Sequence, residues 1–230
     1  MSYAASYAKP KSGLDTNVMS SSVASGSQDW KQKPLQRGKS SPTDNKGDKL
    51  TKLVTDRLLL REFVEDDWRA VLAYQSEAQY LKYSPWTHRT AEEVQDFVQG
   101  FIDWQGERPR TKYQLAITLR VEGRLIGNCG IRIETADSWQ ANIGYEIAPG
   151  YWGEGYATEA ARAMVAFGFG ELRLHRIWAR CVAENVASYR VLEKVGMRRE
   201  GRLREQECMK GQGRDTLVYG ILDHEWRSRT

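Results

Sequence analysis

The sequence contains few cysteines and no long hydrophobic run. Its 3 cysteines, Cys129, Cys181 and Cys208, are too few, too scattered and odd in number for a disulfide framework, which suits a reducing cytosol. None of them stands in a spacing typical of a metal site, so we expect no metal. No apolar run approaches the roughly 18 residues that a membrane-spanning helix needs, and no signal-peptide core is present near the start. The composition therefore predicts a cytoplasmic protein without a membrane partner.

Aliphatic residues are scarce at the amino-terminal end. Residues 1–54 are rich in Ser, Lys, Gly, Asp and Asn and show no sustained hydrophobic period, so we expect them to be disordered. They carry 9 Lys and Arg against 4 Asp and Glu, whereas residues 55–230 carry 25 against 26. The balanced remainder gives no gross electrostatic case for nucleic-acid binding. The tail is interpreted either as a solvated extension or linker or as a basic arm that touches ribosomal RNA.

One glycine-bearing turn stands out, in the stretch 142–163, NIGYEIAPGYWGEGYATEAARA. An apolar run with strand character ends at a Pro-Gly pair, and an Ala-rich segment with helical spacing begins near Tyr156. Gly153 and Gly155 have no Cβ, so the backbone can closely approach a bulky group. Amides at a helix N-terminus have no intrahelical partners, and the helix dipole favours negative charge there. The pattern predicts a phosphate cradle, with an ordinary Gly-rich turn as the alternative.

Two well-known phosphate motifs do not fit this turn. A dinucleotide-binding fingerprint requires a third small residue, where Thr158 stands, and an acidic residue roughly 20 positions later. The corresponding region, residues 175–177, offers no carboxylate. A P-loop requires Gly-Lys followed by Ser or Thr, which this turn lacks. Neither a Rossmann nor a P-loop nucleotide site is therefore predicted.

Two segments in sequence carry a family resemblance, GYEIAPGYWGEGYATEA and, further on, ENVASYRVLEKVGM. Together they resemble the acetyl-CoA-binding core of the GNAT N-acetyltransferases, and more narrowly the ribosomal-protein N-terminal acetyltransferases (RimJ/RimL-like). The resemblance covers about residues 55–227, so we expect one GNAT domain at 55–230. One position departs from the pattern, because Gly150 stands where the superfamily has Gln or Arg.

Hydrophobic patterning predicts a mixed α/β fold. Strands are expected after Arg57 and at residues 113–118, 125–133, 143–148, 177–182, 198–209 and 217–222. Helices are expected after Asp66-Asp67, from a capping box at Thr90 and Glu93, and at residues 156–168 and 187–195. The resemblance implies a central, mostly antiparallel sheet with a splayed strand pair, flanked by helices. Gly127 and Gly130 predict a bulge or a close backbone approach. The aromatic loop 80–86 is either a hydrophobic plug or a lid that faces the substrate.

The resemblance also implies where acetyl-CoA, the co-substrate, would bind. Pantetheine would bind the backbone of Glu146, Ile147 and Ala148 between the splayed strands. The pyrophosphate would lie on the turn and first helical residues, which are Trp152, Gly153, Glu154, Gly155, Tyr156, Ala157 and Thr158. Asn185 would lie near the coenzyme, and it is also a good N-cap for the following helix. The side chains of Glu154 and Glu159 are interpreted as structural, since carboxylates complement the helix dipole there.

Amide formation requires a neutral amine, a stabilised oxyanion and a proton for the departing thiolate. Ser188 is the polar residue on the apolar face of the 187–195 helix, where it either bonds the backbone or, as the resemblance implies, protonates the thiolate. The superfamily's usual tyrosine is replaced here by Leu192. Glu146 is the candidate base, with an edge carboxylate paired to an arginine as the alternative. His88, His175 and His224 stand in unrelated contexts, so no His-based triad is predicted.

These observations predict an acetyl-CoA-dependent N-acetyltransferase whose acceptor is a protein or peptide N-terminus. A small amine, such as a polyamine, an amino acid or an aminoglycoside, is the alternative acceptor, and a non-catalytic acyl-CoA-binding module is the alternative class. Ribosome association and a homodimer are compatible with the sequence, which leaves both open.

Overall fold

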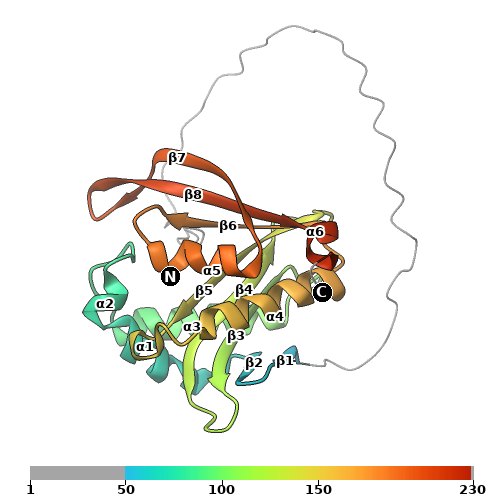
Figure 1. Ribbon diagram of the computed structural model, residues 1–230. Coiled ribbons are helices and arrows are strands. Elements are labelled where there is room, and N and C mark those ends of the chain that lie inside the picture. Colours follow the sequence, from blue (N-terminus) through green and yellow to red (C-terminus); the bar gives the residue numbers. More distant parts are fainter. Residues whose placement is uncertain (1–49, 229–230) are drawn as a thin grey trace, which may run out of the picture. The chain divides into compact units, whose positions relative to one another are not determined.

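The computed structural model describes residues 50–228 (Figure 1). Within this part of the chain, the strands form an eight-stranded sheet in the order β1-β2-β3-β4-β5-β6-β8-β7. The strands are β1 (Lys52–Val54), β2 (Leu58–Glu62), β3 (Lys112–Leu119), β4 (Leu125–Ile133), β5 (Gln140–Ile147), β6 (Arg176–Val182), β7 (Arg198–Met209) and β8 (Gln212–Leu222). The helices are α1 (Trp68–Gln75), α2 (Ala78–Leu81), α3 (Ala91–Gln105), α4 (Tyr156–Gly170), α5 (Val186–Val195) and α6 (Asp223–Arg227), with 3₁₀ turns at Glu65–Asp67 and Pro149–Tyr151. The predicted mixed α/β class is confirmed.

The sheet opens between its two parallel strands, β5 and β6. They pair only where Gln140–Asn142 meets Arg176–Trp178, and the remainder of each strand follows its antiparallel partner, β4 or β8. Because β5 is paired with β4 up to Ile147 and β6 is paired with β8 up to Val182, the two strands separate toward their carboxyl ends. This is the splayed strand pair that the family resemblance implied, and it lies beside the N-terminus of α4.

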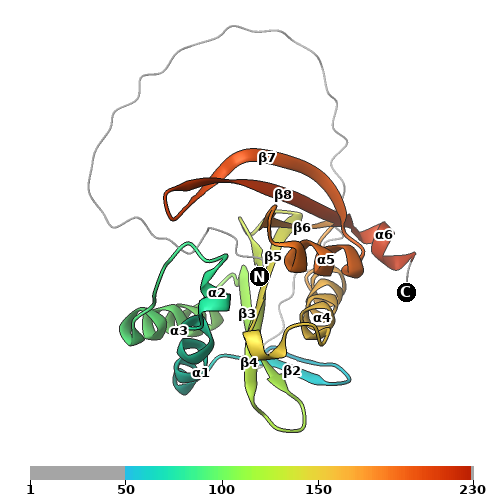
Figure 2. The same ribbon diagram turned by 60° about the vertical axis from the view of Figure 1, so that its left-hand side comes forward.

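Helices cover the two faces of the sheet differently (Figure 2). On one face, α4 and α5 pack on the largest apolar cluster, and the backbone of α4 comes close because Ala160, Ala161 and Gly168 are small. A Cβ on Gly168 would lie only 2.7 Å from the Ile131 and Ile177 side chains. On the other face, α1 and α3 bury Val71, Val94, Val98 and Phe101. The sheet therefore separates two environments that residues on β5 can reach alternately.

Several predicted local signals are confirmed. Thr90 and Glu93 form the capping box of α3, and the Asn185 side chain accepts a hydrogen bond from the Ser188 amide at the start of α5. Gly196 ends α5 in the left-handed region with φ of 106°. Gly127 lies at a register shift between β3 and β4, and a Cβ there would stand 2.2 Å from the Glu146 carbonyl oxygen. Both the bulge and the close approach are thus present.

Three boundaries differ from the predictions. Strand β1 includes Lys52–Val54, which was assigned to the disordered tail; it is ordered because it pairs with β2. The aromatic loop 80–86 begins inside α2, since Tyr80 is anchored in the core. Strand β8 begins at Gln212 instead of the predicted residue 217, because Lys210 and Gly211 both adopt positive φ and form a tight two-residue hairpin turn. The rest of the tail, residues 1–49, lies outside the described residues.

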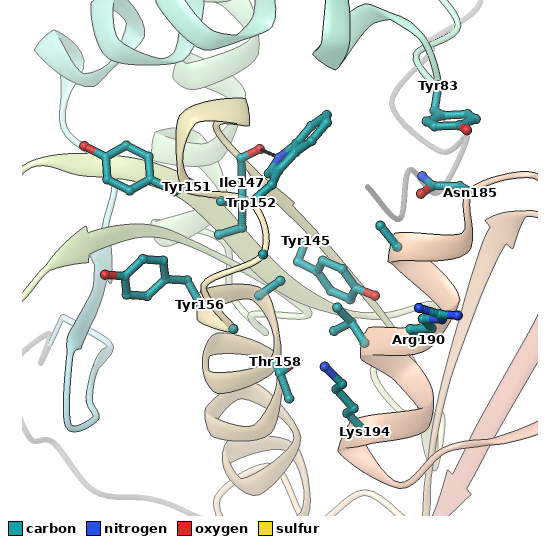
Figure 3. Close-up of a pocket in the computed structure, with 15 residues that line it drawn as sticks. Tyr83, Tyr145, Ile147, Tyr151, Trp152, Tyr156, Thr158, Asn185, Arg190 and Lys194 are labelled. Atoms are coloured by element: carbon teal, nitrogen blue, oxygen red, sulfur yellow. Dashed lines mark hydrogen bonds between the residues drawn. The ribbon is translucent and has the colours of Figure 1, made fainter.

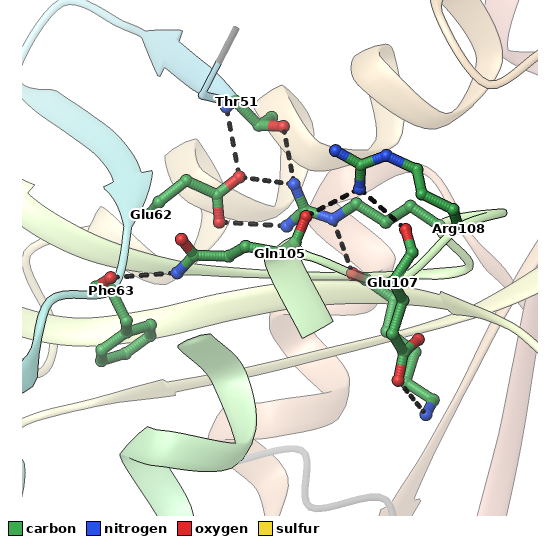
Figure 4. A network of polar contacts seen from close by, with 8 residues as sticks. Thr51, Glu62, Phe63, Gln105, Glu107 and Arg108 are labelled. Atoms are coloured by element: carbon green, nitrogen blue, oxygen red, sulfur yellow. Dashed lines mark hydrogen bonds and ion pairs between the residues drawn. The ribbon is translucent and has the colours of Figure 1, made fainter. Parts of the chain in front are cut away.

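A polar network ties β1 and β2 to the segment that leads into β3 (Figure 4). The buried Glu62 carboxylate accepts both ends of the Arg110 guanidinium, at 2.8 and 3.0 Å, and the Thr51 amide at 3.1 Å. Nearby, the Gln105 side chain donates to the Phe63 carbonyl at 3.0 Å. A carboxylate held in this way has its charge paired and its lone pairs used, so it is a structural group.

Among residues 50–228 the longest helices, α3 and α4, have 15 residues each, and none is long and apolar enough to cross a bilayer.

Candidate functional site

A cavity of about 240 Å³ lies where the carboxyl end of β5, the turn before α4 and the helix α5 meet (Figure 3). Eight of the residues predicted to bind the coenzyme line it, namely Ile147, Trp152, Gly153, Gly155, Tyr156, Ala157, Thr158 and Asn185. Two segments about thirty residues apart in the chain, the turn before α4 and the start of α5, therefore line one cavity.

Four other predicted site residues do not line this cavity. Ala148, which directly follows β5, is buried, and its amide donates to the Ile126 carbonyl of β4 at 2.7 Å. Glu154 is exposed, and its carbonyl accepts from Arg57 at 2.9 Å. Glu146 and Ser188 are buried, Glu146 on the opposite face of the sheet and Ser188 on the buried side of α5.

The turn before α4 has the geometry of an anion cradle. Gly153 and Gly155 adopt φ of 86° and 81°, a region that residues with a Cβ rarely enter, and Gly155 is the N-cap of α4. No side chain caps this helix N-terminus. In the first turn, the Glu159 carboxylate already accepts hydrogen bonds from the Thr55 hydroxyl and from the amide and side chain of Arg57. Burial alone would raise the pKa of Glu159, but these donors outweigh it and lower that pKa. Its predicted structural role is confirmed.

Two cations that the sequence reading missed face the cradle. Arg190 and Lys194 are one turn apart on α5, and both line the cavity; Figure 3 shows Lys194 reaching from α5 toward α4. They supply positive charge to the cavity, whereas Gly150, at the position where the superfamily has Gln or Arg, has no side chain to do so. Their spacing of four on the helix that begins at Asn185 is the signal that would have pointed to them. A pyrophosphate fits this arrangement of helix amides and basic side chains.

On the edge of β5 that faces the gap, one backbone carbonyl already accepts a hydrogen bond from a side chain. Because the Ala148 amide points to β4, alternation directs the backbone groups of Ile147 toward the gap and those of Glu146 toward β4. The Ile147 carbonyl accepts the Trp152 indole N–H at 2.6 Å. Of the three residues predicted to bind pantetheine through their backbone, Ile147 alone presents its groups to the gap.

Tyr145 brings a hydroxyl to the same cavity and was also missed as a site residue. Its phenol donates to the Ser188 carbonyl at 2.7 Å and lies 3.5 Å from the Ser188 hydroxyl. Burial raises the pKa of Tyr145 well above its ordinary value, and the contact with Ser188 offsets only part of this effect. The phenol therefore stays protonated through the neutral range. Of these two residues, Tyr145 lines the cavity and Ser188 does not.

On the other face of the sheet, Glu146 is the centre of a buried cluster. Its Oε1 accepts from the Tyr74 hydroxyl at 2.6 Å, from the Gln75 amide at 3.1 Å and from the Asn128 amide. Its Oε2 accepts from the Tyr80 hydroxyl. The alternative of an edge carboxylate paired with an arginine is wrong, because β5 is an interior strand and all four partners are neutral.

The aromatic segment 80–86 divides between its two interpretations. Tyr80 is completely buried and holds Glu146, which makes it a plug. Tyr83 lines the cavity, and its hydroxyl donates to the Glu184 carbonyl at 3.1 Å, just before α5. The Lys210 ammonium of the β7–β8 turn donates to the Leu81 carbonyl at 2.6 Å. Three distant parts of the chain thus meet beside the gap.

The histidines lie apart from this site. His175 stacks on Trp139 and contacts Asp223, while His88 and His224 are exposed. Over residues 50–228, no group of three or more His, Cys, Asp or Glu side chains is arranged to hold a metal ion.

Comparison with known proteins identifies the family. Residues 57–198 match the model of the acetyltransferase (GNAT) domain. The chain is a GNAT acetyltransferase. The uncharacterized N-acetyltransferase YnaD of Bacillus subtilis is 38% identical over 174 residues, which are 76% of this chain and 98% of YnaD. The crystal structure of a GNAT-family acetyltransferase from Bacillus anthracis has a TM-score of 0.67 and 34% identity, and covers 76% of this chain and 99% of that one.

A structure from Vibrio cholerae, described provisionally as a ribosomal-protein-serine acetyltransferase, has a TM-score of 0.62 and 25% identity, and covers 75% of this chain and 97% of that one. The predicted family, the N-acetyltransferase activity and the use of acetyl-CoA are confirmed. In this GNAT enzyme, the cavity that most of the predicted coenzyme-binding residues line is on one face of the sheet, and the buried Glu146 with its neutral partners is on the other.

Proposed function

We propose that this GNAT enzyme transfers the acetyl group to the N-terminal amine of a protein or peptide. The observation that supports this acceptor is the charge of the buried groups. Among the described residues three carboxylates are buried, and Glu62 and Asp67 are each bound by an arginine. Glu146 alone has neutral partners. One carboxylate suits one amine on an otherwise neutral chain, whereas a polyamine or aminoglycoside site should present several. The Vibrio cholerae likeness points to the same acceptor class.

In this proposal, a residue on one face of β5 acts on the acceptor and a residue on the other face acts on the coenzyme. Glu146 accepts the proton that the acceptor ammonium loses, and Oε2 is the atom available for it because Oε1 already accepts three donors. Tyr145, the residue that precedes Glu146 on the strand, lines the cavity proposed for the coenzyme. The coenzyme supplies an acetyl thioester when it is bound. A base and an acid thus lie on opposite faces of the sheet beside the gap between β5 and β6, where the acceptor and the coenzyme can meet.

A panel of acceptors tests the proposed function. The full chain is incubated with acetyl-CoA and with short peptides that begin with Ser, Ala or Met, with spermidine or with kanamycin, and thiol release is followed. We expect the peptides to give the highest kcat/KM. The matched control is the same peptide with a blocked N-terminus and an internal lysine, which should not react. Faster turnover of spermidine or kanamycin would favour the small-amine alternative. Coenzyme binding without acceptor-dependent thiol release would indicate a binding module.

The cavity geometry also predicts which hydroxyl serves the departing thiolate. Tyr145→Phe should lower kcat by about 10², at the low end for general acid–base catalysis, with coenzyme affinity nearly unchanged. Ser188→Ala should lower kcat less, because the main bond of Tyr145 is to the Ser188 backbone, which alanine keeps. Both rates are measured where chemistry is shown to limit turnover. If Ser188→Ala has the larger effect, the serine is the direct proton donor that the sequence predicted.

A further inference from the structure

A chain of polar side chains crosses the sheet from Arg132 to Glu146. The Arg132 guanidinium donates to the Gln114 carbonyl oxygen at 2.7 Å, and the Gln114 amide nitrogen donates to the Asn128 side-chain oxygen at 2.6 Å. The Asn128 amide nitrogen donates in turn to Glu146. All four residues are buried, with Arg132 the most exposed at 8%. They lie on one face of β3, β4 and β5, because they occupy alternate positions of paired strands.

The direction of this chain is set at the arginine. Glutamine and asparagine side chains can present either an oxygen or a nitrogen to a neighbour, but a guanidinium can only donate. Arg132 therefore requires the oxygen of Gln114, which leaves the nitrogen of Gln114 for Asn128 and the nitrogen of Asn128 for Glu146. The Asn142 side chain holds the other end of the guanidinium at 3.1 Å. Each link presents a donor toward the carboxylate.

The backbone is shaped to admit the middle link. Gln114 faces Gly130 across the β3–β4 pair, and a Cβ on Gly130 would stand 1.9 Å from the Gln114 side-chain oxygen. The Gln114 amide lies over the glycine and so reaches both Arg132 and Asn128, which flank it on β4. A side chain at residue 130 would displace the Gln114 amide from its contacts with Arg132 and Asn128.

We propose that Arg132 is a positioning residue for the acetyl transfer, acting through Gln114 and Asn128 to hold a hydrogen-bond donor on Glu146. The inference rests on the proposed role of Glu146 as the base. The donor stabilises the ionised carboxylate, and the other groups that face it are the hydroxyls of Tyr74 and Tyr80 and the amide of Gln75. If the hydrogen bond from Gln114 is lost, the buried Asn128 side-chain oxygen has no donor. Asn128 can then recover a hydrogen bond only by turning its nitrogen away from Glu146.

The test measures the titration of Glu146 directly and needs no acceptor. Full-length protein labelled with ¹³C at glutamate side-chain carboxyls is titrated by NMR, and the Glu146 signal is assigned by its loss in Glu146→Gln. Arg132→Met removes the head of the chain and its charge. Gln114→Met removes the middle link and leaves the charge. Thr118→Val is the matched control, since it removes a buried polar group from the same face of β3 outside the chain.

We expect the midpoint of the Glu146 titration to move up by about one pH unit in Arg132→Met and in Gln114→Met. The double variant should shift no further than the larger single shift, because both changes cut one chain. Arg132→Lys keeps a donor for Gln114, so its midpoint should lie much closer to that of the parent protein. Thr118→Val should cause no shift of the midpoint. Coenzyme affinity should stay unchanged, since the cavity is on the other face.

Two results would overturn the inference. A shift in Arg132→Met without one in Gln114→Met would mean that the arginine acts by its field alone, and no shift in either folded variant would make the chain purely structural. The acidic limb of kcat/KM separates this inference from the proposed function. If that limb survives in Glu146→Gln, the base is another group. If it disappears there but does not move in Gln114→Met, the base assignment stands and the positioning role fails.

Discussion

We expect Gly155→Val to abolish acetyl-CoA binding, with a loss of affinity of at least about 100-fold. Gly155 is the N-cap of α4 and adopts φ of 81°, which a β-branched residue cannot reach without strain. The valine would move the turn out of the left-handed region and turn the amides at the helix N-terminus away from the cavity. A Cβ at this position would make only an ordinary contact with an Arg57 guanidinium nitrogen, at 3.5 Å, so the expected effect comes from the backbone conformation. Calorimetric titration with acetyl-CoA measures the effect.

Gly150→Ala is the matched control, because Gly150 lies in the preceding turn and a Cβ there meets no atom within 4 Å. It should bind acetyl-CoA as the parent does. Both variants are compared by Tm, so that a loss of folding is separated from a loss of binding. A folded Gly155→Val protein with unchanged affinity would contradict the assignment of the phosphate cradle.

We expect Glu146→Gln to lower kcat/KM by about 10² to 10⁴ and to remove the acidic limb of its pH profile. The amide has the shape of the carboxylate, so its oxygen can still accept from Tyr74, Gln75 and Asn128, while its nitrogen can donate to the Tyr80 oxygen. The cluster that joins α1 and α2 to β5 is therefore kept, whereas the capacity to take a proton is lost. Steady-state rates over a pH series, with an acceptor that the panel identifies, measure the change.

Glu193→Gln is a suitable control, since the Glu193 carboxylate also accepts a tyrosine hydroxyl, that of Tyr219 at 3.0 Å, but it lies on α5. Its pH profile should match that of the parent. If Glu146→Gln keeps the acidic limb and most of its rate and only loses stability, the carboxylate is a structural tie between helices and sheet.

Much of the local structure was predictable because it depends on residues three or four apart. The capping box of Thr90 and Glu93, the Asn185 cap and the Gly196 stop are each set within one helical turn, so the sequence predicts them without knowledge of the fold. The glycine turn before α4 belongs to the same class, since the freedom to adopt positive φ is a local property of glycine. The boundary of the tail was misplaced because Lys52–Val54 is ordered only by pairing with β2.

The sequence by itself therefore determined the family, the order of most strands and helices and the position of the glycine turn before α4. The tertiary structure alone decided which side chains meet across the sheet. Glu146 is hydrogen-bonded to Tyr74 and Tyr80, which lie 72 and 66 positions earlier in the chain, and Arg190 lines the same cavity as Gly155 only because α5 lies against α4. Strand alternation separates Tyr145 from Glu146, but only the packing of α4 and α5 on one face and of α1 on the other decides that the tyrosine faces the coenzyme cavity. Such contacts depend on strand register and helix docking, which no short sequence pattern encodes.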